Sequence, residues 1–477
     1  MKRHTRRGFL RIVGAAAGAL AAGPLAPATA GDDGSDKKPN FIIIYLDNMG
    51  YGDLACFGSK VNRTPAVDKM ASEGMRLTSF YVTSGVCTPS RSSLMTGCYP
   101  RRVNLHQDER GRCVLFPAAR KGLNPKEITI AELLKARGYA TCCIGKWHLG
   151  DQLDFLPTRQ GFDRYYGIPY SNDMRRRQIP LPLMIDETVT EAPVDQDTLT
   201  RRYTEEAVKF ITANKDRPFF LYLPHFAVHL PLHAGEAFRG KSANGRYGDM
   251  VEEVDWSTGQ ILKTLKQFGI DERTMVVFTS DNGSTGRNGG SNAPLRGHKG
   301  QTLEGGHRVP CVARWPGHIP AGRTCDELAS TVDMLPTIAG LSGGAVPTDR
   351  VIDGRDIWPL LSARPGAKTP HEVFYYYQVD QLQAVRSGKW KLHLPLKVKK
   401  KNWGKPDKNA PVALYDLDAD IHEDHNLADQ HPDVVKRLTD LAAKAQADLG
   451  DMGVKGAHQR PAGWVDHATG RLLPKKP

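Results

Sequence analysis

Four groups of polar residues, each following a run of apolar residues, are the first candidates for chemistry in this sequence. Ligands of a parallel α/β sheet bind beyond the carboxyl ends of its strands, so residues at those positions converge. We therefore expect these groups to form one site. The groups are Asp47-Asn48 after 41–46, Lys146-Trp147-His148 after 140–144, His225 and His229 after 218–223, and Asp281-Asn282 after 274–280.

The two Asp-Asn pairs predict a metal site. They offer only oxygen ligands, which favours a hard cation such as calcium or magnesium over zinc or copper, and calcium is the preferred candidate. Taken singly, each pair also fits a turn or a helix cap, where Asp and Asn are common. The prediction therefore depends on Asp47, Asn48, Asp281 and Asn282 meeting in space.

The segment 84–97 places a cysteine, Cys87, before Pro89 and Arg91. A helix predicted to start at Ser90 would present backbone N–H groups and its positive end to an anion. Arg91 falls one turn after Cys87 and is expected to point back at that anion, which a sulfate would fit. The alternative for Cys87 is a buried structural thiol, since free cysteines are commonly buried.

The pattern Cys-x-Pro-x-Arg, followed here by Ser-Ser-Leu-Met-Thr-Gly, closely resembles the signature of the formylglycine-dependent (type I) sulfatases, arylsulfatase-like enzymes of the alkaline phosphatase superfamily. Further matches extend over nearly the whole of the predicted mature chain, at 47–53, 145–150, 229–231, 281–283, 296–300, 414–417 and 426–428. One position differs, because the family usually has Asp-Asp where this chain has Asp47-Asn48. An Asn oxygen still coordinates calcium, so Asn48 remains a predicted ligand, with weaker affinity or a changed metal preference.

The resemblance implies a mechanism. A formylglycine-generating or anaerobic sulfatase-maturating enzyme oxidises Cys87 to an aldehyde, whose hydrate binds the metal together with the two Asp-Asn pairs. One hydroxyl attacks sulfur and displaces the alcohol, and the other loses a proton to His148, which expels inorganic sulfate. The remaining roles are implied for Arg91 and Lys146, which orient the hydrate, for Lys299, which holds the sulfate, and for His229, the general acid on the leaving-group side.

Short apolar strands alternate with helical stretches over 40–365, which predicts an α/β catalytic domain with a large mixed, mostly parallel sheet sandwiched by helices. Over 366–477 the pattern predicts a smaller α+β C-terminal domain, an antiparallel sheet plus a helix, with an irregular tail after Gly450. The predicted strands are 41–46, 140–144, 218–223, 274–280, 373–377, 384–394 and 414–417, and the predicted helices are 65–73, 129–137, 200–214, 248–267 and 432–449.

Residues 1–30 are predicted to be an export signal, followed by a linker at 31–39. Arg6-Arg7 before Phe9-Leu10 resembles a twin-arginine signal, and the apolar run 12–22 is shorter than the ~20 residues that span a bilayer. We expect the twin-arginine export machinery as a partner, a periplasmic or secreted location, and no stable membrane anchor. The eight cysteines are too few for a disulfide scaffold and lack the spacing of structural zinc sites, although a bridge or two stays open.

The formal net charge is +13, of which five charges lie in residues 1–30, so the remainder carries +8. This balance suits an anionic substrate, and no nucleic-acid motif accompanies it. The basic runs 397–408 and 175–177 are read as solvated loops, although either would suit a sulfated glycan. Sulfated carbohydrates are preferred to simple aryl sulfates as substrates. Two alternatives remain open: a phosphatase or phosphodiesterase of the same superfamily, and a non-catalytic protein that binds sulfated glycans, which Asn48 alone supports.

Overall fold

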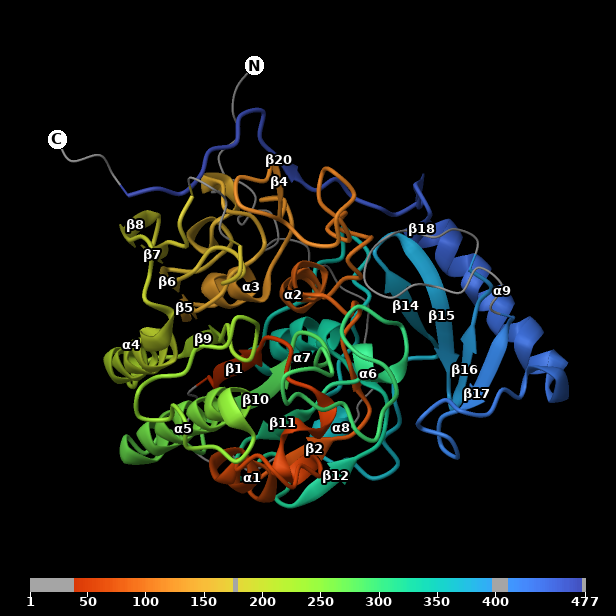
Figure 1. Cartoon of the computed structure of the whole chain (residues 1–477), viewed down its shortest axis with the longest axis horizontal. Helices are drawn as coiled ribbons and strands as arrows, with labels where there is room; N and C mark the ends of the chain where they lie inside the picture. The colour runs from red at the N-terminus through yellow and green to blue at the C-terminus, as the bar shows by residue number, and fades with distance from the viewer. Residues whose placement is uncertain (1–37, 175–178, 397–410, 474–477) are drawn as a thin grey trace, which may run out of the picture. The chain divides into compact units, whose positions relative to one another are not determined.

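The computed structural model describes residues 38–174, 179–396 and 411–473 (Figure 1). Its largest element is a ten-stranded sheet whose five central strands run parallel, with antiparallel strands towards both edges. This confirms the predicted mixed, mostly parallel sheet. Its strands, in spatial order, are β12 (Arg323–Cys325), β2 (Met75–Leu77), β11 (Cys311–Arg314), β10 (Thr274–Ser280), β1 (Asn40–Leu46), β9 (Phe219–Pro224), β5 (Ala140–Ile144), β6 (Arg164–Gly167), β7 (Leu183–Ile185) and β8 (Thr188–Glu191).

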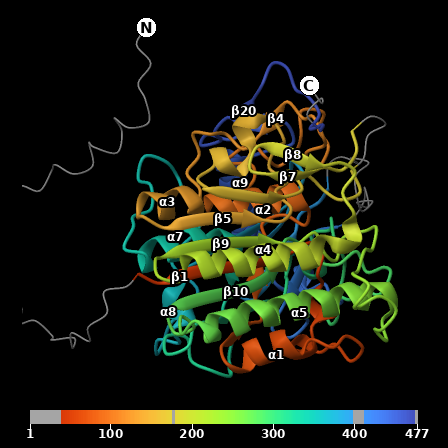
Figure 2. The same cartoon turned by 90° about the vertical axis from the view of Figure 1, so that its left-hand side faces the viewer.

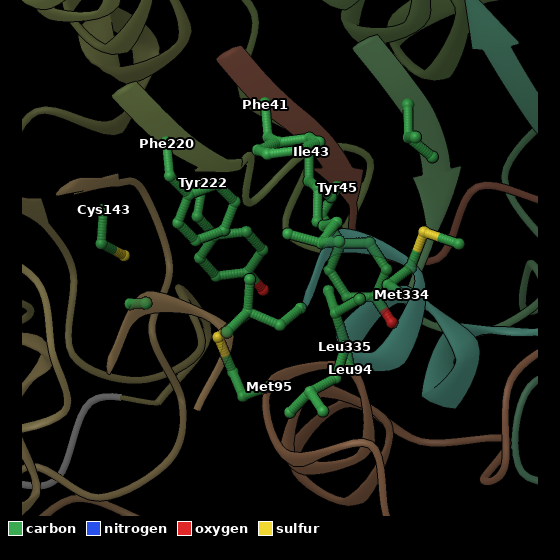
Figure 3. Close-up of a cluster of buried hydrophobic side chains, with 14 of the residues drawn as sticks. Phe41, Ile43, Tyr45, Leu94, Met95, Cys143, Phe220, Tyr222, Met334 and Leu335 are labelled. Carbon is green, nitrogen blue, oxygen red and sulfur yellow. The ribbon is translucent and has the colours of Figure 1, made fainter. Parts of the chain in front are cut away.

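Strand β1 shows why the sheet needs cover on both faces. All seven of its residues are buried. Successive side chains of a strand point to opposite faces, so Phe41, Ile43 and Tyr45 join one hydrophobic cluster (Figure 3), whereas Ile42 and Ile44 join the other. An uninterrupted apolar run is typical of a parallel strand buried between two helical layers.

Helices cover both faces of the sheet. One cluster includes side chains of α1, α4 and α5, which lie side by side in Figure 2, and the other includes side chains of α2, α3, α7 and α8. The helices are α1 (Pro65–Ser72), α2 (Cys87–Thr96), α3 (Ile130–Ala136), α4 (Leu199–Asn214), α5 (Gly245–Gln267), α7 (Met334–Leu341) and α8 (Trp358–Leu361), and the short helix α6 (Glu304–His307) lies near the site described below.

The C-terminal part forms a separate four-stranded antiparallel sheet with helix α9 (Pro432–Leu449) packed against it (Figure 1). Its strands are β14 (Phe374–Gln378), β15 (Gln381–Ser387), β16 (Trp390–His393) and β17 (Ala413–Asp416). The prediction of one strand over 384–394 is wrong, because the chain turns back at Gly388-Lys389. Gly388 has a φ of 58°, a conformation that glycine adopts without strain and that a two-residue hairpin turn requires.

The tail after Gly450 is less irregular than predicted. A two-residue strand, β20 (Gly463–Trp464), pairs with β4 (Lys121–Gly122) of the catalytic domain. Two further short pairings complete the chain, β3 (Phe80–Tyr81) with β13 (Ala329–Ser330) and β18 (Gly450–Asp451) with β19 (Val454–Lys455).

The predicted export signal, most of the predicted linker and the basic runs 175–177 and 397–408 lie outside the described residues. None of the helices in the described ranges combines the length and the apolar character that crossing a bilayer requires. All eight cysteines are described, and each is a free thiol.

Candidate active site

The four predicted groups meet at one edge of the sheet. Strands β10, β1, β9 and β5 are consecutive neighbours and run parallel, so their carboxyl ends lie together. Backbone hydrogen bonds continue beyond the strands: Asp47 N–H donates to the Ala227 carbonyl at 2.8 Å, and Asp281 N–H donates to the Leu46 carbonyl at 2.9 Å. The sheet itself therefore fixes the backbone of the residues that follow each strand.

Cys87 is the first residue of helix α2, which begins three residues earlier than predicted. Proline is tolerated in the first turn of a helix because the N–H groups there have no helical partner, so Pro89 does not delay the start. The buried Cys87 side chain lies at the positive end of α2. Its sulfur is 3.4 Å from Asp47 Oδ1 and 3.3 Å from Lys299 Nζ.

Five charged side chains surround this sulfur, and we call them the charged cluster: Asp47, Asp281, Arg91, Lys146 and Lys299. All are buried, the most exposed being Lys299 at 6%. Arg91 donates to Asp281 Oδ2 from Nε at 3.0 Å and from a terminal nitrogen at 2.7 Å. Arg91 is thus paired with a carboxylate, whereas the sequence predicted that it faces a bound anion. Lys146 contacts Asp47, and Lys299 Nζ donates to Asn48 Oδ1 at 2.6 Å.

The electrostatics of the site keep the cysteine protonated. Burial raises the pKa of the Cys87 thiol to about 12, and the nearby Asp281 and Asp47 carboxylates add to that effect. Burial also raises the pKa of the Asp47 carboxyl, but the neighbouring Lys146, His229 and Arg91 outweigh it and hold that pKa well below its usual range. At neutral pH the site therefore combines an ionised Asp47 with a neutral thiol.

The four oxygen-bearing residues fit a hard cation. Asn282 Nδ2 donates to Asn48 Oδ1 at 2.8 Å, which brings the two pairs together. Asn282 Oδ1 is buried and has no hydrogen-bond partner among the described residues. This oxygen is therefore available to coordinate a cation. In addition, donor atoms of Asp47, Cys87 and His229 lie within 4.8 Å of one another. Asn48 has a φ of 68°, a left-handed conformation common at functional sites.

The two predicted catalytic histidines have defined tautomers. His148 Nε2 lies 2.9 Å from the Leu115 carbonyl, which only accepts, so Nε2 carries the proton. Nδ1 of His148 is buried without a hydrogen-bond partner in the described ranges, and burial and Lys146 hold the pKa of this imidazole well below its usual range. His229 Nδ1 donates to the Leu230 carbonyl at 2.5 Å, and burial and Lys299 lower its pKa to about 4. Both rings are therefore neutral at pH 7.

Comparison with known proteins decides which family this site belongs to. The family model described as sulfatase matches residues 39–344, and the model for the C-terminal region of aryl-sulfatase matches residues 369–466. The chain belongs to the sulfatase family. The sequence-based assignment is therefore confirmed, and the protein is an enzyme of the sulfatase class, with the fold of the alkaline phosphatase-like sulfatases.

Similar proteins cover most of this sulfatase. Human arylsulfatase A is 38% identical over 458 residues, which are 86% of this chain and 89% of that protein. The N-acetylgalactosamine-6-sulfatase of Canis lupus familiaris is 40% identical over 397 residues, 77% of this chain and 74% of that protein. The solved structure of the PsFucS1 sulfatase from Pseudoalteromonas sp. has a TM-score of 0.77 at 28% identity and covers 86% of this chain and 90% of that one.

The active site of the sulfatase also contains contacts from residues that the sequence analysis did not identify. Ser171 Oγ accepts a hydrogen bond from Lys146 Nζ at 3.0 Å, and the Leu115 carbonyl fixes the His148 tautomer. Both belong to long connections whose conformation has no sequence signal. By contrast, His225 points away from the charged cluster, and its Nε2 lies 3.3 Å from Ser257 Oγ. The sequence placed His225 among the groups at the strand ends but gave it no catalytic role, and in the structure it contacts Ser257 of helix α5.

Proposed function

We propose that this sulfatase hydrolyses sulfate esters of carbohydrates with a formylglycine made from Cys87, beside a bound calcium ion. The observation that carries the proposal is the position of Cys87, buried between Asp47 and Lys299 at the start of α2. A thiol with a pKa of about 12 is protonated at neutral pH and is a poor nucleophile as it stands. The site is built around a side chain that needs conversion before it can react.

Calcium fits the oxygen ligands that surround Cys87. Asp47, Asn48, Asp281 and Asn282 would hold it, together with the oxygen that a formylglycine has in place of the Cys87 sulfur. The ion would supply positive charge next to the reacting group. Magnesium is the second choice because it demands a stricter octahedral shell, whereas calcium accepts irregular ones.

The chain's own residues account for proton movement and charge. A hydrated formylglycine would offer one hydroxyl to attack sulfur and a second whose proton is removed to release sulfate. His148 Nδ1 is the matching acceptor, since the Leu115 carbonyl keeps the proton on the other ring nitrogen. His229 is placed on the leaving-group side, where a bound sulfate anion would raise the pKa of its imidazole towards the range of a general acid. Lys299 would balance the charge of the sulfate oxygens, and Lys146, paired with Asp47, would orient the hydrate.

A carbohydrate substrate is supported by the relatives and by charge. One relative is named for a sulfated sugar, N-acetylgalactosamine 6-sulfate. The formal net charge of +8 beyond position 30 also suits a polyanionic glycan. The features of residues 1–30 support export by the twin-arginine route to the periplasm or beyond, after maturation of Cys87 by a formylglycine-generating or anaerobic sulfatase-maturating enzyme.

A sulfate-release assay tests the proposal. The purified enzyme, co-produced with a maturating enzyme, is given sulfated mono- and oligosaccharides, p-nitrophenyl sulfate and p-nitrophenyl phosphate. Sulfate release from sugars is expected, together with complete loss in Cys87→Ala while calcium binding persists. Faster turnover of the phosphate ester would favour the phosphatase alternative, and glycan binding without any turnover would favour the non-catalytic one.

A further inference from the structure

The short helix α6 (Glu304–His307) touches two of the segments that carry site residues and lies beside the third. Gly305 N–H donates to the Arg296 carbonyl at 2.8 Å, in the loop that leads to Lys299. Gly283 N–H, directly after Asn282, donates to the Gly306 carbonyl at 3.2 Å. A Cβ added to Gly85, two residues before Cys87, would lie 3.3 Å from the same Gly306 oxygen.

These contacts pack α6 closely against the metal-binding segment that contains Asn282. A Cβ at Gly283 would lie 1.8 Å from the Gly305 carbonyl oxygen, so only glycine allows this approach. The segments also bond to each other, because Gly300 N–H donates to the Gly85 carbonyl at 2.8 Å. A displacement of α6 would therefore move the backbone next to Asn282, Cys87 and Lys299.

The first residue of α6, Glu304, is held by the C-terminal sheet through one carboxylate oxygen and by the Tyr81 hydroxyl of β3 through the other. Its carboxylate accepts from Lys391 Nζ of β16 at 2.9 Å and from the Tyr376 hydroxyl of β14 at 3.0 Å. Its backbone N–H donates to Glu423 Oε2 at 2.8 Å, and Lys391 Nζ lies 2.9 Å from the other Glu423 oxygen. One lysine thus joins two carboxylates, and one of those carboxylates also caps the backbone of α6.

The side chains of Glu304, Lys391 and Glu423 form a completely buried link, so the loss of any one of them is expected to disturb the position of α6. Glu304, Lys391 and Glu423 each have 0% exposure. Burial by itself raises the pKa of both carboxyls, but the surrounding cations, with Lys391 the largest contributor, outweigh it and keep the pKa of Glu304 and of Glu423 below the usual range. Removing one partner of such a buried pair leaves an uncompensated charge that the interior does not tolerate.

From this we propose that Lys391, acting through Glu304, is a positioning residue for the active site. The C-terminal domain then does more than cover the catalytic domain, because it sets the relative places of Asn282, Cys87 and Lys299 through α6. Lys391 touches none of the reacting atoms. The inference rests on the proposed function for its activity measurement, but its structural measurement is independent of any substrate.

The test compares Lys391→Met with Lys389→Met in the full-length, matured enzyme. Lys389 lies two residues away in the same hairpin and pairs with Asp416, but its side chain is 45% exposed, so water screens its loss. Glu304→Gln is the second variant, because it weakens the link to Lys391 by removing the carboxylate charge and leaves Lys391 paired with Glu423. It keeps the proposal testable if Lys391→Met does not fold.

Two readouts are expected to move together. Per folded, formylglycine-containing molecule, kcat for p-nitrophenyl sulfate should fall about ten- to a hundredfold in Lys391→Met, the usual range for groups that orient a metal site. The double variant with Glu304→Gln should lose no more than Lys391→Met alone, since both changes act on the same link. Hydrogen exchange of the Gly283, Gly300 and Gly305 amides should accelerate in both single variants and stay unchanged in Lys389→Met.

Unchanged exchange at these three amides would overturn the proposal, whatever the activity. Unchanged kcat despite faster exchange would also overturn it, because α6 would then move without affecting the site. If the wild type released no sulfate at all, the proposed function would fail while the exchange data still decided the role of Lys391.

Discussion

Lys299 and Arg91 are buried cations of the same cluster, and we predict that replacement by Met lowers the stability for Arg91 but not for Lys299. Arg91 is paired: it makes two hydrogen bonds to Asp281, at 3.0 and 2.7 Å. Lys299 makes its two hydrogen bonds to neutral groups, Asn48 Oδ1 at 2.6 Å and the protonated Cys87 thiol at 3.3 Å. The cluster has three cations for two carboxylates, so Lys299 is the one left for the sulfate.

The magnitudes follow from this pairing. Arg91→Met leaves Asp281 buried without its main partner, which costs about 3–5 kcal/mol of the free energy of unfolding. Lys299→Met keeps the aliphatic stem and removes a surplus buried charge, so the free energy of unfolding should stay within about 1 kcal/mol of the wild type or rise. The same change removes a cation from the bound sulfate, and kcat/KM should fall by about 10²- to 10³-fold, as for the loss of one oxyanion-hole donor.

Thermal unfolding in EDTA and sulfate release from p-nitrophenyl sulfate measure the two effects separately. The expected result for Lys299→Met is an unchanged or higher melting temperature with little activity, and for Arg91→Met a clearly lower melting temperature. The reasoning is refuted if Lys299→Met is as unstable as Arg91→Met, or if it keeps most of its kcat/KM.

Two further predictions concern the metal and pH. Asn48→Asp adds a negative charge to the ligand set and should tighten calcium binding about tenfold or more in isothermal titration calorimetry; unchanged affinity would mean that Asn48 is not a ligand. Burial lowers the pKa of His225 to about 3, so below pH 6.5 the unfolded chain binds a proton that the folded chain does not, and stability falls as the pH falls. Between pH 6.5 and 4.5 this amounts to about 2 kcal/mol, which His225→Gln should remove; an equal acid slope in urea unfolding of both proteins would contradict it.

The strand ends were predictable because periodicity and position carry the information. An uninterrupted apolar run such as Ile42–Ile44 predicts a strand buried on both faces, and the polar residues after it must lie at the carboxyl edge. Asp47, Lys146, His229 and Asp281 are therefore brought together as expected, although up to 234 residues separate the first from the last.

The remaining features depend on contacts that local sequence does not encode. The predicted start of α2 was three residues late, since the first helical turn accepts Pro89. Ser171 and Leu115 enter the site from long connections. Glu304 and Lys391 lie 87 positions apart, and only tertiary packing shows that they meet.

The mass of the tryptic peptide 77–91, which contains Cys87, tests the central claim most directly. The peptide is taken from active enzyme made in its native host, and its modified fraction is compared with specific activity across preparations. We expect the aldehyde form at position 87 and an activity proportional to its abundance. Full sulfatase activity with an unmodified Cys87 thiol would contradict the account.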